Sequence, residues 1–204
     1  MKIGILGTGH IGKTLVRKLS EAGHDVKAAN SRGPASIGPD ILSSGGRAVT
    51  AEDAVTNVDV VILSIPFNKI PDVAPLLSAI PDETVVIDTS NYYPARDERI
   101  DAVEAGQVES LWVAEQLGRP IAKAWNAIGT ASLPDKGKPG GEPGRVAVPD
   151  PAERQEVFCE APLSVLGVRV RVDGLRPGGG RPRGDRPAAL AEPRGAADVG
   201  EPLL

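Results

Sequence analysis

The chain has 204 residues, of which 41% are hydrophobic and 25% are charged. These proportions are typical of soluble globular proteins and exclude disorder over the whole length. A domain usually has about 150 residues, so the length predicts one domain with an extension. The net charge of -4 argues against a surface that binds nucleic acid.

The composition changes after residue 133. Residues 1–133 contain 8 prolines and 12 glycines, whereas the 71 residues from 134 to 204 contain 11 prolines and 12 glycines. No lysine follows Lys138, although nine arginines do. These differences predict a folded domain over residues 1–133, a partial extension of it over 134–174 and a disordered tail over 175–204.

The number of cysteines and the hydropathy of the sequence indicate in which cell compartment the protein is located. The single cysteine, Cys159, excludes an internal disulfide and a metal site with several thiolate ligands. No run of 18 apolar residues is present, and the segment from Met1 leads into a glycine motif too soon for a signal peptide. We therefore expect a cytoplasmic protein with no membrane contact.

Short runs of apolar and β-branched residues alternate with segments of helical periodicity along the first part of the chain. This alternation predicts an α/β fold, a doubly wound parallel sheet of the Rossmann type. The predicted strands span residues 2–6, 25–29, 47–50, 59–64, 84–88 and 121–125. Helices are predicted between the first two strands, ending near residue 23, and over residues 51–57, 68–79 and 109–117. Pro71 and Pro75 predict that the helix over 68–79 begins late or is broken.

A glycine-rich motif, Gly7-Thr8-Gly9-His10-Ile11-Gly12, lies between the first predicted strand and the first predicted helix. In such a GxGxxG motif, the first glycine permits a tight turn, the second lets a pyrophosphate approach the backbone, and the third lets helix and strand pack closely. The helix N-terminus adds free N–H groups and a partial positive charge for the phosphates. The motif predicts dinucleotide binding, with a purely structural glycine turn as the alternative.

The end of the second predicted strand indicates which nucleotide binds. NAD-binding proteins usually place Asp or Glu about 20 residues after the glycine motif, to hold the ribose 2′-hydroxyl. This chain instead has Asn30-Ser31-Arg32-Gly33, with a hydroxyl and a guanidinium that suit a 2′-phosphate. The sequence therefore favours NADP, and the alternative is that Arg32 is an ordinary solvated loop residue.

Polar residues also follow the later predicted strands, where ligands of a doubly wound sheet bind. They are Ser64, which precedes Ile65 and Pro66, then Ser90 and Asn91 after Asp88, and Asn126 after Trp125. Such residues bind the amide and ribose of a nicotinamide nucleotide, or they only form turns.

The sequence offers no metal site. His10 and His24 have no Cys or His partner at the spacing of metal ligands, and there is no GxSxG, HExxH or GxxxxGK[ST] motif. Hydrolase, zinc-protease and P-loop chemistry therefore have no support.

Five ordered segments of the chain are GILGTGHIG (4–12), NSRG (30–33), ILSIPF (62–67), VVIDTSNYYPARD (85–97) and KAWNAI (123–128). Together they resemble the NADP oxidoreductases that use the deazaflavin coenzyme factor 420, over about residues 1–148. The resemblance implies a Rossmann domain that binds NADP(H). The residues it implies at the cofactor are Thr8, Gly9, His10 and Ile11 at the pyrophosphate, Ser31 and Arg32 at the 2′-phosphate, and Ile65, Pro66 and Asn126 near the nicotinamide.

In that family, hydride passes directly between nicotinamide carbon 4 and the deazaflavin ring. The resemblance therefore implies no catalytic acid, base or nucleophile, because the cofactors carry the chemistry and the protein orients them. The implied partner is a small redox acceptor, a deazaflavin or else a flavin, a metal chelate or a carbonyl compound. Related enzymes commonly dimerise through their C-terminal region, so the resemblance implies a homodimer only if that region is intact in this chain, and the sequence itself does not give the oligomeric state.

Two other functions stay open. The chain is a regulatory or degenerate NADP-binding module if its C-terminal part builds no acceptor site. It is an NADPH-dependent imine or carbonyl reductase if a proton donor is present. Tyr92 and Tyr93 are candidate donors besides His10, but we expect both tyrosines to pack in the loop after the fifth strand.

The C-terminal part departs from the family pattern at residues 149–151. A helix is predicted over 152–160 and a strand over 168–172, and Val172-Asp173-Gly174 resembles the family's last strand. From residue 168 onward, 24 of 37 residues are Arg, Gly, Ala or Pro, whose codons are rich in G and C. We hypothesise a reading out of frame that starts between residues 149 and 175, with a genuine disordered tail as the alternative.

Overall fold

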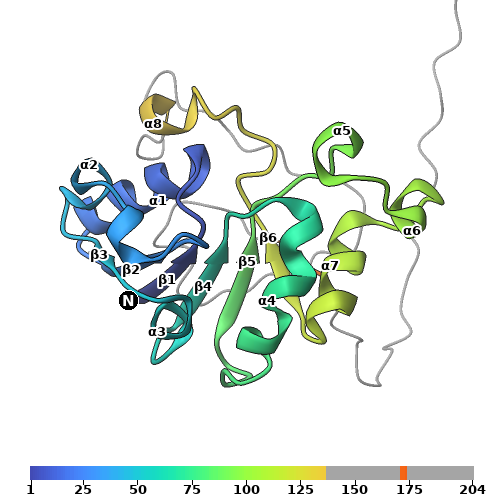
Figure 1. Cartoon of the computed structure of the whole chain (residues 1–204), viewed down its shortest axis with the longest axis horizontal. Helices are drawn as coiled ribbons and strands as arrows, with labels where there is room; N and C mark the ends of the chain where they lie inside the picture. Colours follow the sequence, from blue (N-terminus) through green and yellow to red (C-terminus); the bar gives the residue numbers. More distant parts are fainter. Residues whose placement is uncertain (137–170, 174–204) are drawn as a thin grey trace, which may run out of the picture.

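The computed structural model describes residues 1–136 and 171–173. In this part of the chain, strands alternate with helices, and the strands form one sheet with helices on both faces (Figure 1). The strands are β1 (Lys2–Leu6), β2 (Asp25–Ala29), β3 (Arg47–Ala48), β4 (Val60–Leu63), β5 (Val85–Asp88), β6 (Ile121–Lys123) and β7 (Arg171–Asp173). The helices are α1 (His10–Glu21), α2 (Pro39–Leu42), α3 (Ala51–Val55), α4 (Ile70–Leu77), α5 (Pro94–Asp97), α6 (Asp101–Glu104), α7 (Glu109–Leu117) and α8 (Leu133–Lys136).

The strand order in the described sheet is β3-β2-β1-β4-β5-β6-β7. Neighbouring strands from β3 to β6 pair in parallel, and β7 pairs with β6 in the antiparallel direction. The order reverses at β1, which pairs with β2 on one side and β4 on the other. This confirms the predicted α/β fold, a doubly wound sheet of the Rossmann type.

Side chains of alternate residues build a hydrophobic core on each face of the sheet. In β1, Ile3 and Ile5 point to the face covered by α1, α2 and α8, whereas Leu6 points to the face covered by α3, α4 and α7. Gly4 lies on the second face, where α3 comes so close that a Cβ atom would overlap the carbonyl oxygen of Ala54. The central strands are buried on both faces, as parallel strands usually are.

Proline shapes the helix that the sequence predicts over residues 68–79. The chain first makes a 3₁₀ turn at Phe67–Lys69, and α4 then runs from Ile70 to Leu77 with Pro71 in its first turn. A proline is tolerated there because that N–H group has no partner within the helix. Pro75 lies inside α4 and removes one hydrogen bond, but it does not break the helix. The prediction of a late start is confirmed.

Several predicted elements differ at their ends or lie outside the described residues. The strand predicted over 121–125 stops at Lys123, because Trp125 has φ 59°, in the left-handed region. The strand predicted over 168–172 corresponds to β7, which begins at residue 171 where the description resumes. The helix predicted over 152–160 and the tail over 175–204 fall outside the described residues. The domain boundaries stay a prediction.

Within residues 1–136 and 171–173, no helix is long and apolar enough to cross a membrane.

Candidate functional site at the carboxyl edge of the sheet

The glycine motif forms a tight turn at the carboxyl end of β1. Gly7 has φ 103°, a conformation that favours glycine, and its N–H donates to the carbonyl of Ala29 at 2.8 Å. A Cβ atom on Gly7 would overlap the carbonyl oxygen of Ser64, and one on Gly12 would overlap that of Gly7. Both glycines are therefore required by close packing of the turn against α1 and the end of β4.

The N-terminus of α1 is open towards this edge. Gly9 is the residue before the helix, and no side chain in the described part of the chain caps its N–H groups. A Cβ atom placed on Gly9 would find no other atom within 4 Å, so the space over it is free. Free N–H groups at a helix N-terminus and room for a close approach are what a phosphate needs.

Asn30 organises the loop after β2. Its side-chain amide donates to Thr8 Oγ1 at 3.0 Å, and its Oδ1 accepts hydrogen bonds from the Arg32 N–H at 2.9 Å and from Ser36 Oγ at 3.0 Å. The side chains of Ser31 and Arg32 are exposed beside this junction. The structure thus joins Thr8 and Asn30 and leaves Ser31 and Arg32 open to solvent. Their roles as ligands stay a prediction.

Residues after β4 lie next to the glycine turn. The Ser64 N–H donates to the carbonyl of Leu6 at 2.8 Å, so β1 and β4 leave the sheet side by side. Ile65 is half-buried and Pro66 is exposed. Phe67 is fully buried, and its ring stacks on Trp112 with centroids 4.8 Å apart. The predicted residues Ser64, Ile65 and Pro66 are therefore held at the same edge as the motif.

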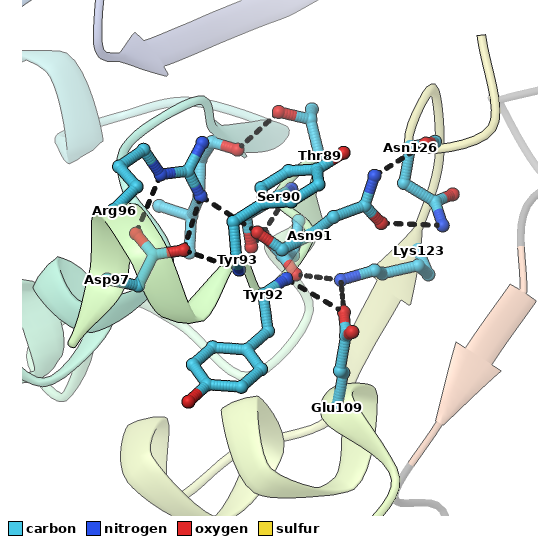
Figure 2. A network of polar contacts seen from close by, with 12 residues as sticks. Thr89, Ser90, Asn91, Tyr92, Tyr93, Arg96, Asp97, Glu109, Lys123 and Asn126 are labelled. Atoms are coloured by element: carbon cyan, nitrogen blue, oxygen red, sulfur yellow. Dashed lines mark hydrogen bonds and ion pairs between the residues drawn. The ribbon is translucent and has the colours of Figure 1, made fainter. Parts of the chain in front are cut away.

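The segments after β5 and β6 meet through two asparagines (Figure 2). Asn91 Nδ2 donates to the backbone carbonyl of Asn126 at 2.8 Å, and Asn126 Nδ2 lies 3.4 Å from Asn91 Oδ1. Ser90 instead turns inward, because its N–H and hydroxyl both donate to Asp88 Oδ1, at 2.9 and 2.7 Å. The structure thus brings Asn91 and Asn126 together and leaves Ser90 only 7% exposed.

A buried ion pair lies beneath the asparagines. Lys123 Nζ lies 2.7 Å from Asp88 Oδ2, and the Asp88 side chain is fully buried. Glu109, at the start of α7, lies 3.9 Å from Lys123 Nζ and accepts a hydrogen bond from the Tyr92 N–H at 3.2 Å. Sequence reasoning gave no role to these charged residues. Only the pairing of β5 with β6 brings them together.

A second ion pair holds the loop that leads into α5. Arg96 donates to both carboxylate oxygens of Asp97, at 2.8 and 2.6 Å, and to the Asn91 carbonyl at 2.8 Å (Figure 2). Burial by itself raises the pKa of Asp97, but hydrogen bonds from Arg96 and from backbone N–H groups outweigh it and hold the pKa below its usual range. The loop is thus fixed by a charged carboxylate with almost no solvent contact.

The two tyrosines of this loop differ. Tyr92 packs as predicted, with its ring 5.6 Å from Phe67 and its hydroxyl 3.0 Å from the Glu98 carbonyl. Tyr93 does not pack in the loop: it is 53% exposed and lies under the Arg96 guanidinium, 5.0 Å from ring centroid to Cζ. The prediction for Tyr93 was wrong because the sequence did not reveal that Arg96 would hold the ring at the surface.

Comparison with known proteins identifies the family. Residues 2–92 match the family model described as "NADP oxidoreductase coenzyme F420-dependent". A hypothetical protein from Sinorhizobium meliloti with a crystal structure is 30% identical, with a TM-score of 0.56, and the alignment covers 69% of this chain and 68% of that one. The chain belongs to this family of NADP oxidoreductases.

A second solved structure supports the fold of this family member. It is described as an F420-dependent NADP reductase from Arthrobacter sp. FB24, is 16% identical and has a TM-score of 0.50, with 69% of each chain covered. At this identity the likeness concerns the fold alone. The family match over residues 2–92 includes the glycine turn and the segments after β2, β4 and β5, whereas Asn126 lies beyond it.

The Asp97 ion pair predicts a pH-dependent stability. A carboxylate whose pKa is lowered by folding stabilises the fold fully above its unfolded-state pKa of about 4, and the effect is lost as the pH falls through the lower folded-state pKa. Asp97→Asn should therefore lower the free energy of unfolding at pH 7, and the gap to the wild type should shrink below about pH 4. Urea unfolding at a series of pH values measures this gap.

Asp101→Asn is the matched control for this measurement. It breaks an ion pair with Arg99 in which the two side chains are 73% and 88% exposed, so its effect on the free energy of unfolding should be small at every pH. A gap for Asp97→Asn that stays constant from pH 7 to pH 3 would contradict the lowered pKa.

Proposed function

We propose that this chain binds NADP(H) along the carboxyl edge of its sheet and exchanges hydride between the nicotinamide and a deazaflavin-type or similar redox acceptor. The observation that carries the proposal is the junction of Thr8, Asn30 and Arg32 beside an uncapped helix N-terminus. Membership of the NADP oxidoreductase family supports the same assignment.

The loop after β2 has the groups that would bind the 2′-phosphate of NADP. β2 is followed by the neutral Asn30, so no carboxylate at that position repels a second phosphate. The amide of Asn30 is occupied by Thr8 and by the Arg32 N–H, which leaves the Arg32 guanidinium and the Ser31 hydroxyl exposed for the phosphate. A guanidinium binds phosphate through paired hydrogen bonds.

The pyrophosphate and the nicotinamide suit the rest of the edge. The free space over Gly9 and the uncapped N-terminus of α1 fit a pyrophosphate. Ile65 and Pro66 offer an apolar border next to the turn, and Asn91 and Asn126 offer amide groups for a carboxamide. The chemistry that NADP(H) supplies when bound is hydride donation or acceptance at carbon 4 of the nicotinamide ring.

The charged groups at this edge act through position and not as acids or bases. The carboxylates of Asp88 and Asp97 are each engaged by a cation and by a backbone N–H. The Tyr92 hydroxyl, a candidate proton donor for a carbonyl or imine reductase, is engaged by Glu98, Glu104 and the Ile100 N–H. These contacts argue against Asp88, Asp97 and Tyr92 as proton donors, and they fit direct hydride transfer, in which the protein orients two rings.

Removal of the Arg32 guanidinium tests the 2′-phosphate assignment. Arg32→Ala should weaken NADPH binding by about 10- to 100-fold, because a hydrogen-bonded charge pair is lost, and should leave NADH binding unchanged. The change in nicotinamide fluorescence in separate titrations with NADPH and with NADH measures the two dissociation constants. Arg99→Ala, which removes an exposed arginine between α5 and α6, should change neither dissociation constant. Equal losses for NADPH and NADH would sink the assignment.

The acceptor is tested by reaction. Mixing wild-type protein and NADPH with a deazaflavin should oxidise the NADPH in a stopped-flow experiment, and a flavin or a small carbonyl compound should react more slowly or not at all. Tight NADPH binding with no oxidation by any of these acceptors would contradict the reaction and favour a binding module. Faster oxidation by the carbonyl compound would favour a reductase of carbonyls.

A further inference from the structure

Asp88 and Lys123 are direct partners in the pairing of β5 with β6. Each is the last residue of its strand, and the ammonium lies 2.7 Å from the carboxylate. The Asp88 side chain is fully buried, and that of Lys123 is 10% exposed. A buried charge is costly unless it is paired and hydrogen-bonded, so removal of one partner leaves the other in an unfavourable state.

The hydrogen bonds of this pair go to the segment that follows β5. Asp88 Oδ1 accepts from the N–H and the hydroxyl of Ser90, and Oδ2 accepts from Lys123. Glu109 lies near Lys123 and accepts from the Tyr92 N–H. Residues on both sides of Asn91 are therefore fixed by the same small group of charges, as Figure 2 shows.

The segment that follows β6 is fixed from the same point. The Ala124 N–H donates to the Asp88 backbone carbonyl at 3.1 Å, and Trp125 then adopts its left-handed conformation. Asn91 is the third residue after Asp88, and Asn126 is the third after Lys123. The ion pair thus lies at the base of two short segments whose ends carry the two asparagines.

The asparagine pair has side-chain amide groups that are available to bind a ligand. Each asparagine donates one side-chain N–H to the other residue: Asn91 to the Asn126 backbone carbonyl, and Asn126 to Asn91 Oδ1. Asn126 Oδ1 accepts no hydrogen bond from the residues that the structure describes. A free amide oxygen beside an amide N–H complements a carboxamide, which has one acceptor and one N–H₂ donor. Such complementarity depends on the orientation of both amides.

We propose that Lys123, paired with Asp88, is a positioning residue for the nicotinamide end of the cofactor. It holds the segments after β5 and β6 so that Asn91 and Asn126 present their amides to the carboxamide in one orientation. This inference rests on the proposed binding of NADP(H). It gives the Asp88–Lys123 pair a role at the nicotinamide end of the site and none at the phosphates. Loss of Lys123 therefore weakens one end of the cofactor site and leaves the other intact.

Binding of two different ligands tests the two ends of the site separately. NADPH reaches both ends, whereas adenosine 2′,5′-bisphosphate carries the 2′-phosphate and no nicotinamide. Lys123→Met should weaken NADPH binding by about 3- to 10-fold and leave the dissociation constant of the bisphosphate unchanged, because hydrogen bonds to neutral amides are lost. The rate of hydride transfer from bound NADPH should fall further, by about 10- to 100-fold, because the ring is less well aligned.

Two further variants make the result decisive. Lys2→Met, which removes an exposed lysine at the opposite edge of the sheet, should change neither dissociation constant. Asp88→Asn/Lys123→Met removes both charges of the buried pair, so the only carboxylate in the described part of the chain that loses a cation is Glu109, which is 36% exposed. The double variant supplies the same comparison if the single variant fails to fold. It should show the same selective loss of NADPH binding.

Two outcomes overturn the inference while the proposed function stands. One is an equal loss of affinity for NADPH and for the bisphosphate, together with a lower melting temperature, which would make the pair a purely structural element. The other is no loss for either ligand. A wild-type protein that binds neither ligand would instead contradict the proposed function, and the inference with it.

Discussion

Backbone hydrogen bonds between the strand ends connect all the segments that build the site. At the carboxyl edge, the first residue beyond a strand donates its N–H to the last carbonyl of the neighbouring strand. These bonds run from Gly7 to Ala29, from Ser64 to Leu6, from Thr89 to Leu63 and from Ala124 to Asp88. Because β1, β2, β4, β5 and β6 all run in the same direction, the five loops that follow them are placed in one row although they come from distant parts of the sequence. Their relative positions depend on the register of the sheet.

The two ends of this row are built from different chemistry. Beside β1 and β2, the groups are glycines, a free helix N-terminus and the neutral Asn30, with the exposed Arg32 guanidinium beside them, so the proposed phosphate site consists of backbone N–H groups and one guanidinium. Beside β5 and β6, two buried carboxylates are neutralised by Lys123 and Arg96 and fix the loops that carry the amides. In the proposed complex, charged groups bind the ligand at one end of the row, whereas at the other end they hold the protein's own loops in place.

Local patterns were sufficient to predict the first end of the site. The glycine motif, its strand and its helix are adjacent in the sequence, and the loop after β2 is read directly from Asn30, Ser31 and Arg32. The second end depends on contacts between residues 35 positions apart, such as Asp88 with Lys123 and Asn91 with Asn126. Short helices such as α5 and α6 have too few residues for a hydrophobic period. The positions of Asn91 and Asn126 after their strands predicted that both lie at this edge, but no local pattern predicted their contact, the Asp88–Lys123 pair or the exposed ring of Tyr93.

The most direct test of the account follows the backbone amide resonances of the protein as NADP⁺ is added. Binding along the carboxyl edge predicts that the largest changes in chemical shift fall in residues 7–12, 30–33, 64–65 and 89–91 and at Asn126. Changes confined to the opposite edge of the sheet, where β1, β2, β4 and β5 begin, would contradict the account. So would the absence of any change at NADP⁺ concentrations that saturate a typical dinucleotide site.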